Sequence, residues 1–297
     1  MTSEAETDST RTEILTWYAH NARELPWRLH GTTPWGVFVS EVMSQQTPVA
    51  RIAPAWEQWL GRWPTPCALA DASPADVIKE WGTLGYPRRA LWLREAATTM
   101  CIEFSGQVPA DYADLITLPG VGDYTAASVS AFAYQRRTIV LDTNVRRVFA
   151  RVFTGVERPI SSSATKIERC LADQLAPRDG VQAAEWAVAS MEFGSLVCKA
   201  TAPDCLICPI QDRCQWFRAG RPPNKCAPRK QQRFEGTDRQ VRGKLMAVLR
   251  TSDQHGVLSA ELIACWPVDD QRERCLASLI TDGLVEPFAG DRYRLPH

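Results

Sequence analysis

The sequence lacks any uninterrupted apolar run near the roughly 20 residues that a membrane-spanning helix needs. Residues 1–11 are polar, carry three acidic side chains and lack the apolar segment of a secretory signal. We therefore expect a cytoplasmic protein with no membrane partner, and we predict that residues 1–11 are disordered.

Net charge is also missing, because 34 basic side chains balance 34 acidic ones. A protein of this kind does not hold nucleic acid by bulk electrostatics and would need a local basic face to do so. Taken singly, each basic cluster is typical of a solvated helix face. The clusters are Arg88–Arg89, Arg136–Arg137, Arg146–Arg147 with Arg151, and the stretch from Arg221 to Arg233.

Strand-like alternation and internal repeats are absent from residues 12–193, where apolar residues recur at helical spacing. This pattern predicts a mainly α fold. We expect a helical domain over residues 12–219 and a polar, proline-rich linker over 220–236. Residues 237–297 show three amphipathic helices and a terminal hairpin, which predicts a small winged-helix-like domain.

Ten cysteines in a reducing compartment favour metal binding, redox chemistry or burial over disulfides. Five of them are scattered among apolar residues and are predicted to be small core side chains. These are Cys67, Cys101, Cys170, Cys265 and Cys275. Cys226 stands alone in the predicted linker.

The other four cysteines, Cys198, Cys205, Cys208 and Cys214, are separated by six, two and five residues. A segment this short can bring four thiolates around one centre, either a structural zinc ion or a [4Fe-4S] cluster. Spacing alone leaves both open, although zinc ribbons usually supply two close pairs and this segment has one.

A glycine-containing turn, Leu118–Ala126, lies between two helical stretches. Gly120 and Gly122 flank Val121 and are predicted to allow positive φ angles. The first amides of the following helix, with the helix dipole behind them, would suit a DNA phosphate. An ordinary helix-turn-helix link with glycines for packing is the alternative.

The glycine turn, the aspartate in Leu141–Arg147 and the cysteine segment occur in an order that resembles the endonuclease III superfamily over residues 12–216. Residues 25–28, 40–47 and 82–86 are similar to its MutY-type adenine glycosylase branch. The resemblance implies a two-lobed helix-hairpin-helix fold, one [4Fe-4S] cluster at the four cysteines, and removal of adenine mispaired with 8-oxoguanine or guanine. It implies a monomer acting on double-stranded DNA at the bacterial nucleoid, with weak or no strand cleavage.

Releasing adenine requires protonation of the base and stabilisation of an oxocarbenium-like sugar, two tasks that carboxyl groups perform in glycoside hydrolysis. Glu41 lies between Val39 and Val42–Met43 on an apolar helix face, where desolvation would favour the protonated acid. Asp142 precedes a helix, where we expect it to stay ionised. The resemblance makes Glu41 the general acid and Asp142 the stabiliser of the cation, supported by Asn144. For Glu41 the alternative is a surface carboxylate on a helix. For Asp142 it is an N-cap, which could coexist with catalysis.

Tyr124 stands where bifunctional relatives carry a lysine that forms a Schiff base with the sugar and leads to strand cleavage. A phenol cannot form that base. Tyrosine here also suits a branch that removes mismatched thymine, but that branch is not expected to have an acid corresponding to Glu41.

An enzyme that acts on a stacked base must extrude it from the duplex. The resemblance implies that Gln46 and Tyr86 insert near 8-oxoguanine, with Thr47 close by, while Trp27 and Arg28 border the adenine pocket. Turn packing for Tyr86 and core packing for Trp27 are the alternatives. The remaining DNA contacts are expected in the glycine turn, at Leu118, Gly120, Val121 and Gly122.

Two features depart from the family pattern. Val188 stands where MutY-type proteins usually present Gln or Glu to adenine, and residues 237–297 replace the usual nucleotide-hydrolase-like domain. The C-terminal domain is expected either to contact DNA through Arg239, Arg242 and Lys244 or to serve in packing. Two other functions stay open: a glycosylase for mismatched thymine or oxidised pyrimidine, and an iron-sulfur winged-helix DNA-binding regulator.

Overall fold

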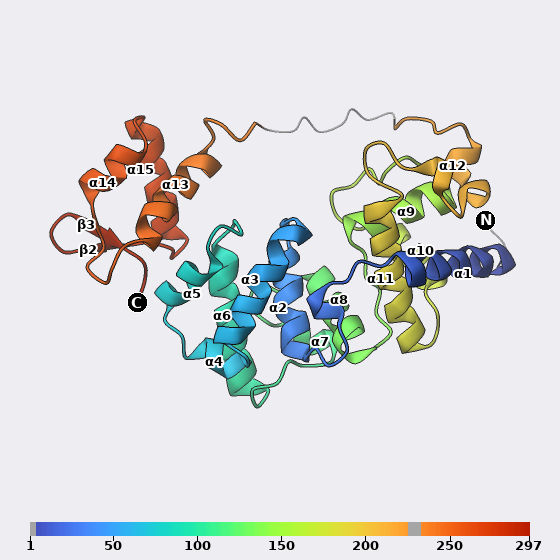
Figure 1. Ribbon diagram of the computed structural model, residues 1–297, viewed down its shortest axis with the longest axis horizontal. Helices are drawn as coiled ribbons and strands as arrows, with labels where there is room; N and C mark the ends of the chain where they lie inside the picture. Colours follow the sequence, from blue (N-terminus) through green and yellow to red (C-terminus); the bar gives the residue numbers. More distant parts are fainter. Residues whose placement is uncertain (1–3, 225–232) are drawn as a thin grey trace. The chain divides into compact units, whose positions relative to one another are not determined.

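A computed structural model describes residues 4–224 and 233–297, and it confirms the mainly helical fold (Figure 1). The chain divides into two compact units, each assembled from separate stretches of sequence. The first unit comprises residues 1–37, 110–117 and 121–229, and the second comprises residues 38–109, 118–120 and 230–297. Residues 1–3, and residues 225–232 of the predicted linker with Cys226, lie outside the described residues.

The first unit is built around α9 and α11, with α1 and α12 packed on them (Figure 1). Its shared core includes Ile14, Phe149, Phe193 and Trp216. The elements are α1 (Glu4–Asn21), η1 (Pro26–Arg28), α7 (Tyr112–Leu115), α8 (Asp123–Tyr134), α9 (Thr143–Thr154), α10 (Lys166–Leu175), α11 (Gly180–Leu196), η3 (Cys205–Ile207), η4 (Gln211–Arg213) and α12 (Gln215–Arg218).

The prediction that residues 1–11 are disordered is wrong for the described residues from Glu4 onward, which form the start of α1. Ile14 anchors this helix in the core, and Glu13 forms an ion pair with Arg213. Glu4 and Glu6 lie in the first turn, where acidic side chains favour a helix N-terminus. The polar N-terminal residues from Glu4 onward are therefore the first turns of a helix that is held in the core further along, at Ile14.

In the second unit, α4 and α5 pack against α6. Local sequence explains where α4 and α5 begin: the hydroxyls of Thr65 and Ser73 accept hydrogen bonds from backbone amides of the next turn, and each is followed by a proline. The elements are the greater part of α2 (Pro34–Ser44), η2 (Val49–Arg51), α3 (Ile52–Arg62), α4 (Pro66–Ala70), α5 (Pro74–Trp81), α6 (Arg88–Glu103), α13 (Asp238–Arg250), β1 (Val257–Leu258), α14 (Ser259–Cys265), α15 (Asp269–Thr281), β2 (Glu286–Phe288) and β3 (Arg292–Arg294).

The three C-terminal helices and the hairpin of β2 and β3 lie where the sequence predicts them, and β1 is additional. The three strands form an antiparallel sheet in the order β1-β3-β2, in which Tyr293 pairs with Val257 on one side and Pro287 on the other. The helices α13, α14 and α15 and this sheet, residues 237–297, are called the C-terminal module below. Ala75 and Ile78 of α5 belong to the same hydrophobic cluster as the core of this module.

The cysteines outside the 198–214 segment behave differently from one another. Cys275 is buried, as predicted, and Cys265 is half-buried. Cys170 is exposed, so its prediction as a core side chain is wrong. Cys67 and Cys101 form a disulfide, which corrects both their assignment and the expectation of no disulfides. Because α4 packs on α6, the Cα atoms of Cys67 and Cys101 lie 5.6 Å apart, inside the range that a disulfide spans.

Among the described residues, no helix combines the length and apolarity that a membrane crossing requires.

Candidate functional site

The glycine turn between α7 and α8 takes a left-handed conformation at one of its two glycines. Gly120 has φ 71°, and a Cβ there would lie 2.6 Å from Cβ of Trp92, so no larger residue fits. Gly122 has φ −102° and forms the N-cap of α8, so the expected positive φ is wrong at this position. Leu118 is buried and Val121 is half-buried.

The first turn of α8 carries Asp123 and Tyr124. Asp123 accepts a hydrogen bond from the Tyr112 hydroxyl at 2.5 Å and forms an ion pair with Arg169. Tyr124 is half-buried, with its hydroxyl 4.0 Å from Sδ of Met191. The side chain at the position of the family's lysine is therefore a phenol packed on a thioether.

Glu41 lies on α2, a helix buried nearly all round. Only 7% of the Glu41 surface is exposed, and its neighbours Val39, Val42 and Met43 are also buried. The burial expected for a carboxylic acid kept protonated is therefore present, whereas an exposed surface carboxylate is not what the structure shows.

Two tight loops of the second unit carry the residues expected to enter DNA. We call them the Gln46 loop (residues 45–48) and the Tyr86 loop (residues 82–87). Gln46 has φ 57° and Tyr86 has φ 46°, a left-handed conformation that is strained for side chains of this size. Gln46 is exposed and Tyr86 is 43% exposed, so Tyr86 is not simply packed in a turn. The Thr47 hydroxyl donates to the Leu84 carbonyl at 3.2 Å and joins the two loops.

Arg89 holds both loops from inside the unit. Its guanidinium donates to the carbonyls of Val42 at 3.0 Å and Gly85 at 2.9 Å, and to the Thr47 hydroxyl at 3.0 Å. Burial lowers its pKa to about 10, which leaves it charged at neutral pH. Sequence reasoning placed Arg89 with Arg88 on a solvated face, and that assignment is wrong for Arg89.

Trp27 and Arg28 lie on η1 in the first unit, and Trp27 is buried. Glu192, which is fully buried on α11, binds Arg23 at 2.6 Å and Arg28 at 3.1 Å. Burial works against ionisation, but the hydrogen bond from Arg23 and the charge of Arg28 hold the pKa of Glu192 below its usual range. Sequence reasoning missed Glu192, although it is the only charged residue in the otherwise apolar or small stretch 187–196.

Asp142 is the N-cap of α9. Its carboxylate accepts hydrogen bonds from the Val145 amide at 2.6 Å and the Asn144 side chain at 2.7 Å. Burial nevertheless raises the pKa of Asp142, because desolvation outweighs these bonds. Burial therefore opposes the ionisation expected for Asp142, and the expected N-cap is present.

A hydrogen-bond chain leads from Asp142 toward the cysteine segment. Arg147 donates to Oδ1 of Asn144 at 2.8 Å and to the carbonyls of Gly194 at 2.6 Å and Cys198 at 2.8 Å. Arg146, Arg147 and Arg151 are all buried, so their assignment to a solvated helix face is wrong. Their guanidinium groups donate hydrogen bonds to backbone carbonyls inside the first unit.

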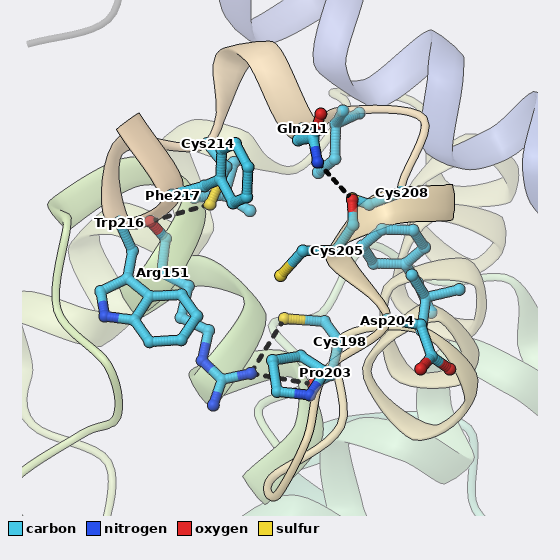
Figure 2. A pocket seen from close by; sticks show the side chains of 14 residues that line it. Arg151, Cys198, Pro203, Asp204, Cys205, Cys208, Gln211, Cys214, Trp216 and Phe217 are labelled. Atoms are coloured by element: carbon cyan, nitrogen blue, oxygen red, sulfur yellow. Dashed lines mark hydrogen bonds between the residues drawn. The ribbon is translucent and has the colours of Figure 1, made fainter. Parts of the chain in front are cut away.

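The four cysteines of the 198–214 segment line one pocket together with Arg151, Phe193 and Trp216. Figure 2 shows the sulfur atoms of Cys198 and Cys205 pointing into the same part of the pocket. Arg151 donates to Sγ of Cys198 at 3.4 Å and lies over the Trp216 ring (Figure 2). Within residues 4–224 and 233–297, no group of three or more histidine, cysteine, aspartate or glutamate side chains is arranged to hold a single metal ion.

Burial raises the pKa of the Cys208 thiol to about 12 and also raises that of Cys214. Thiolates in such a pocket require positive charge beside them, which a bound metal centre or a neighbouring arginine supplies. The donor set and the position of Arg151 therefore fit a group ligated by thiolates.

Residues 39–176 match the family described as HhH-GPD superfamily base excision DNA repair protein. An adenine DNA glycosylase of Mycobacterium tuberculosis is 48% identical over 287 residues, which cover 96% of this chain and 93% of that protein. The chain belongs to this base excision repair superfamily. The resemblance to endonuclease III relatives is thereby confirmed, and the chain is a DNA glycosylase.

Solved glycosylase structures share the fold of this superfamily member. A thermostable thymine-DNA glycosylase aligns with a TM-score of 0.66 and 23% identity, covering 72% of this chain and 98% of that one. Endonuclease III trapped on DNA aligns with a TM-score of 0.64 and 21% identity, covering 74% of this chain and 99% of that one. These similarities establish the fold alone.

The mycobacterial relative aligns over nearly the whole of this glycosylase. The expectation that the resemblance ends before the C-terminal module is therefore wrong. The departure is from family members with a nucleotide-hydrolase-like domain, and the C-terminal module is shared with a relative of closely similar length.

Proposed function

We propose that this DNA glycosylase hydrolyses the N-glycosidic bond of adenine mispaired with 8-oxoguanine or guanine, with weak or no strand cleavage. The observation that carries the proposal is a buried carboxyl group on α2, Glu41, in a chain 48% identical to an adenine DNA glycosylase. Tyr124 supports the absence of strand cleavage, because a phenol does not form a Schiff base with the sugar.

Glu41 is the general acid of the proposed reaction. A carboxyl group with 7% of its surface exposed is surrounded largely by protein, and desolvation favours its neutral form. A neutral carboxylic acid can donate its proton to N7 of an extruded adenine as the bond to the sugar breaks, which makes the base a better leaving group.

Asp142 stabilises the sugar cation that develops as adenine leaves. The Asn144 amide and the Val145 backbone hold the carboxylate in one orientation. Burial raises its pKa in the free protein, whereas a cationic sugar would favour the ionised form. The interaction is therefore strongest as positive charge develops in the transition state.

The remaining predicted site residues serve DNA binding in this proposal. Gln46 and Tyr86 enter the duplex beside 8-oxoguanine, with Thr47 supporting both loops, and Trp27 and Arg28 border the adenine pocket. Main-chain amides of the turn formed by Leu118, Gly120, Val121 and Gly122 contact a phosphate. Arg28 is fixed by Glu192, so its position does not depend on Val188.

We propose that Cys198, Cys205, Cys208 and Cys214 hold one [4Fe-4S] cluster. Four thiolates would bind the iron, which would offset part of their negative charge and fix the fold of the 198–214 segment. Arg151, which donates to Sγ of Cys198, would stabilise the thiolate form of that ligand.

The proposal extends to the domains, the oligomeric state and the cellular location of the protein. Residues 12–219 form the glycosylase domain, 220–236 the linker and 237–297 a winged-helix-like domain. The protein acts as a monomer on double-stranded DNA, in the cytoplasm and at the nucleoid.

Base release from defined duplexes tests the substrate. We expect release from A:8-oxoG and A:G pairs and little from T:G pairs or thymine glycol. Glu41→Gln should bind the duplex as the unaltered protein does but lose at least about 100-fold in the single-turnover rate, the usual scale of general acid catalysis.

Glu57→Gln is the matched control, because Glu57 is an exposed carboxylate on α3. It should keep full activity. Full activity in Glu41→Gln, or release of thymine but not adenine by the unaltered protein, would reject the assignment.

A further inference from the structure

The C-terminal module packs against α5 and α6 within the second unit. Ala75 and Ile78 of α5 enter its hydrophobic cluster. At the edges of this contact, Nζ of Lys79 donates to the Ser252 carbonyl at 2.9 Å, and Arg88 forms an ion pair with Asp282 at 3.0 Å. The module is therefore fixed beside the Tyr86 loop, which connects α5 to α6.

Arg239, the second residue of α13, contacts that loop directly. Its guanidinium carbon lies 5.1 Å from the centroid of the Tyr86 ring and 5.9 Å from that of Phe234. Arg89 lies 5.7 Å from the same tyrosine ring. Tyr86 is thus a partly exposed side chain on a strained backbone, with a cation from the module and a cation from α6 against its ring.

Other basic residues of the module are engaged within the module itself. Arg242 binds Asp282 at 2.6 Å, Arg274 binds Asp238 at 2.8 Å, and Lys244 lies 4.9 Å from the Trp266 ring. Of the three residues expected to reach DNA, only Arg239 contacts a residue with a proposed role in DNA insertion. The geometry therefore favours a role for the module in supporting the loop over a role as a separate DNA reader.

We infer that Arg239 is a positioning residue for Tyr86, through which the C-terminal module sets the side chain that enters the duplex. A left-handed tyrosine costs conformational energy, and the cation–π contact offsets part of that cost before DNA arrives. The inference rests on the proposed insertion of Tyr86. It assigns the module a part in recognising the base opposite adenine.

A double-mutant cycle with Arg239→Ala, Tyr86→Ala and the double variant tests the coupling. Two measurements are made on the full chain with an A:8-oxoG duplex: the single-turnover rate of adenine release, and the fluorescence of 2-aminopurine next to 8-oxoguanine, which reports unstacking. Arg239→Ala should lower the rate about three- to tenfold, the scale of one cation–π contact, and should weaken the fluorescence rise. Arg239→Lys should restore most of both signals.

The control is Arg274→Ala, which removes one positive charge from the same module without contacting Tyr86. It should leave both signals unchanged, and Arg239→Ala should have no further effect in the Tyr86→Ala background. Additive losses, equal losses in Arg274→Ala, or no loss in Arg239→Ala would each overturn the inference. If the unaltered protein unstacks the duplex but releases no adenine, the proposed function fails while the coupling between Arg239 and Tyr86 is still measured by fluorescence.

Discussion

Burial of Asp142 links its proposed role in stabilising the sugar cation to a cost in protein stability. Burial raises its pKa, so the folded protein holds this proton more tightly than the unfolded chain does. The stability contributed by that proton is present below the ordinary titration range of a carboxyl group. It is lost as the pH rises through the folded pKa. At neutral pH, therefore, the buried carboxyl group of Asp142 lowers the free energy of unfolding relative to acidic pH.

We predict that Asp142→Asn unfolds at a higher temperature than the unaltered protein at neutral pH. The gain should shrink as the pH falls toward about 4, where the unfolded carboxyl is also protonated. Asparagine preserves the N-cap, but adenine release should fall by about 100-fold or more because the charge is lost. Asp179→Asn, at the exposed N-cap of α11, should show neither change. A less stable Asp142→Asn protein at neutral pH would contradict the prediction.

At the scale of elements, the approach of α11 to α9 sets the position of the Asp142 cap. Gly194 of α11 permits this approach, because a Cβ there would lie 2.8 Å from Cβ of Asn144 and 3.0 Å from its carbonyl oxygen. Backbone atoms at that distance cannot yield without moving the start of α9. The helix pair therefore couples packing to the geometry of the carboxylate.

Gly194→Ala should lower the free energy of unfolding by about 1–3 kcal/mol, the usual cost of overpacking, and should also slow adenine release. Gly243→Ala is the matched change in α13, where an added Cβ meets no atom within 4 Å. It should raise the free energy of unfolding by about 0.5–1 kcal/mol through helix propensity alone. Urea unfolding measures both, and equal stability of the two variants would refute this account of the α9–α11 contact.

Element types could be predicted from sequence because their cause is local. The apolar spacing of Val145, Val148 and Val152 reappears as the buried face of α9. Arg89 could not be predicted to be buried, because carbonyls from the end of α2, the Gln46 loop and the Tyr86 loop come together around it only in the folded protein. The Cys67–Cys101 disulfide could not be predicted from the sequence either, since it depends on how α4 packs against α6.

The same limit applies to the candidate site. Glu41, Asp142 and the four cysteines carry sequence signals, namely an apolar helix face, a helix start and a short spacing. Glu192 carries a weaker signal, because one carboxylate in an apolar helix does not reveal its partners. Arg23 and Arg28 reach it from 164 or more residues away in sequence. Contacts that form only through tertiary packing cannot be predicted from local sequence patterns.

At the scale of the whole molecule, several of the arginines that balance the acidic residues are buried. Arg89, Arg146, Arg147 and Arg151 are buried, where they bind backbone carbonyls and a few acidic or polar side chains. These four arginines therefore stabilise the interiors of the two units. Side chains buried in this way add little to a basic surface, which fits a formal net charge of zero.

The cysteine pocket links the proposed cluster to the stability of the entire first unit. Cys214, Ile210 and Trp216 belong to the same core as Ile14 of α1 and Phe193 of α11. The carbonyl of Cys198 also accepts a hydrogen bond from Arg147, which orients Asn144 beside Asp142. Loss of the proposed cluster should therefore disturb both the core and the orientation of Asp142.

Cys208→Ser should abolish the visible absorbance of the cluster and lower the free energy of unfolding by several kcal/mol, because the free energy of metal binding contributes to folding. Adenine release should fall in parallel with cluster content, since the Arg147 bridge loses its anchor. Cys170→Ser is the control, because Cys170 is an exposed thiol on α10 of the same unit, and it should match the unaltered protein. Thermal unfolding, iron content and single-turnover release are measured together. A Cys208→Ser protein without iron that unfolds at the unaltered temperature would show that the cysteine segment does not support this core.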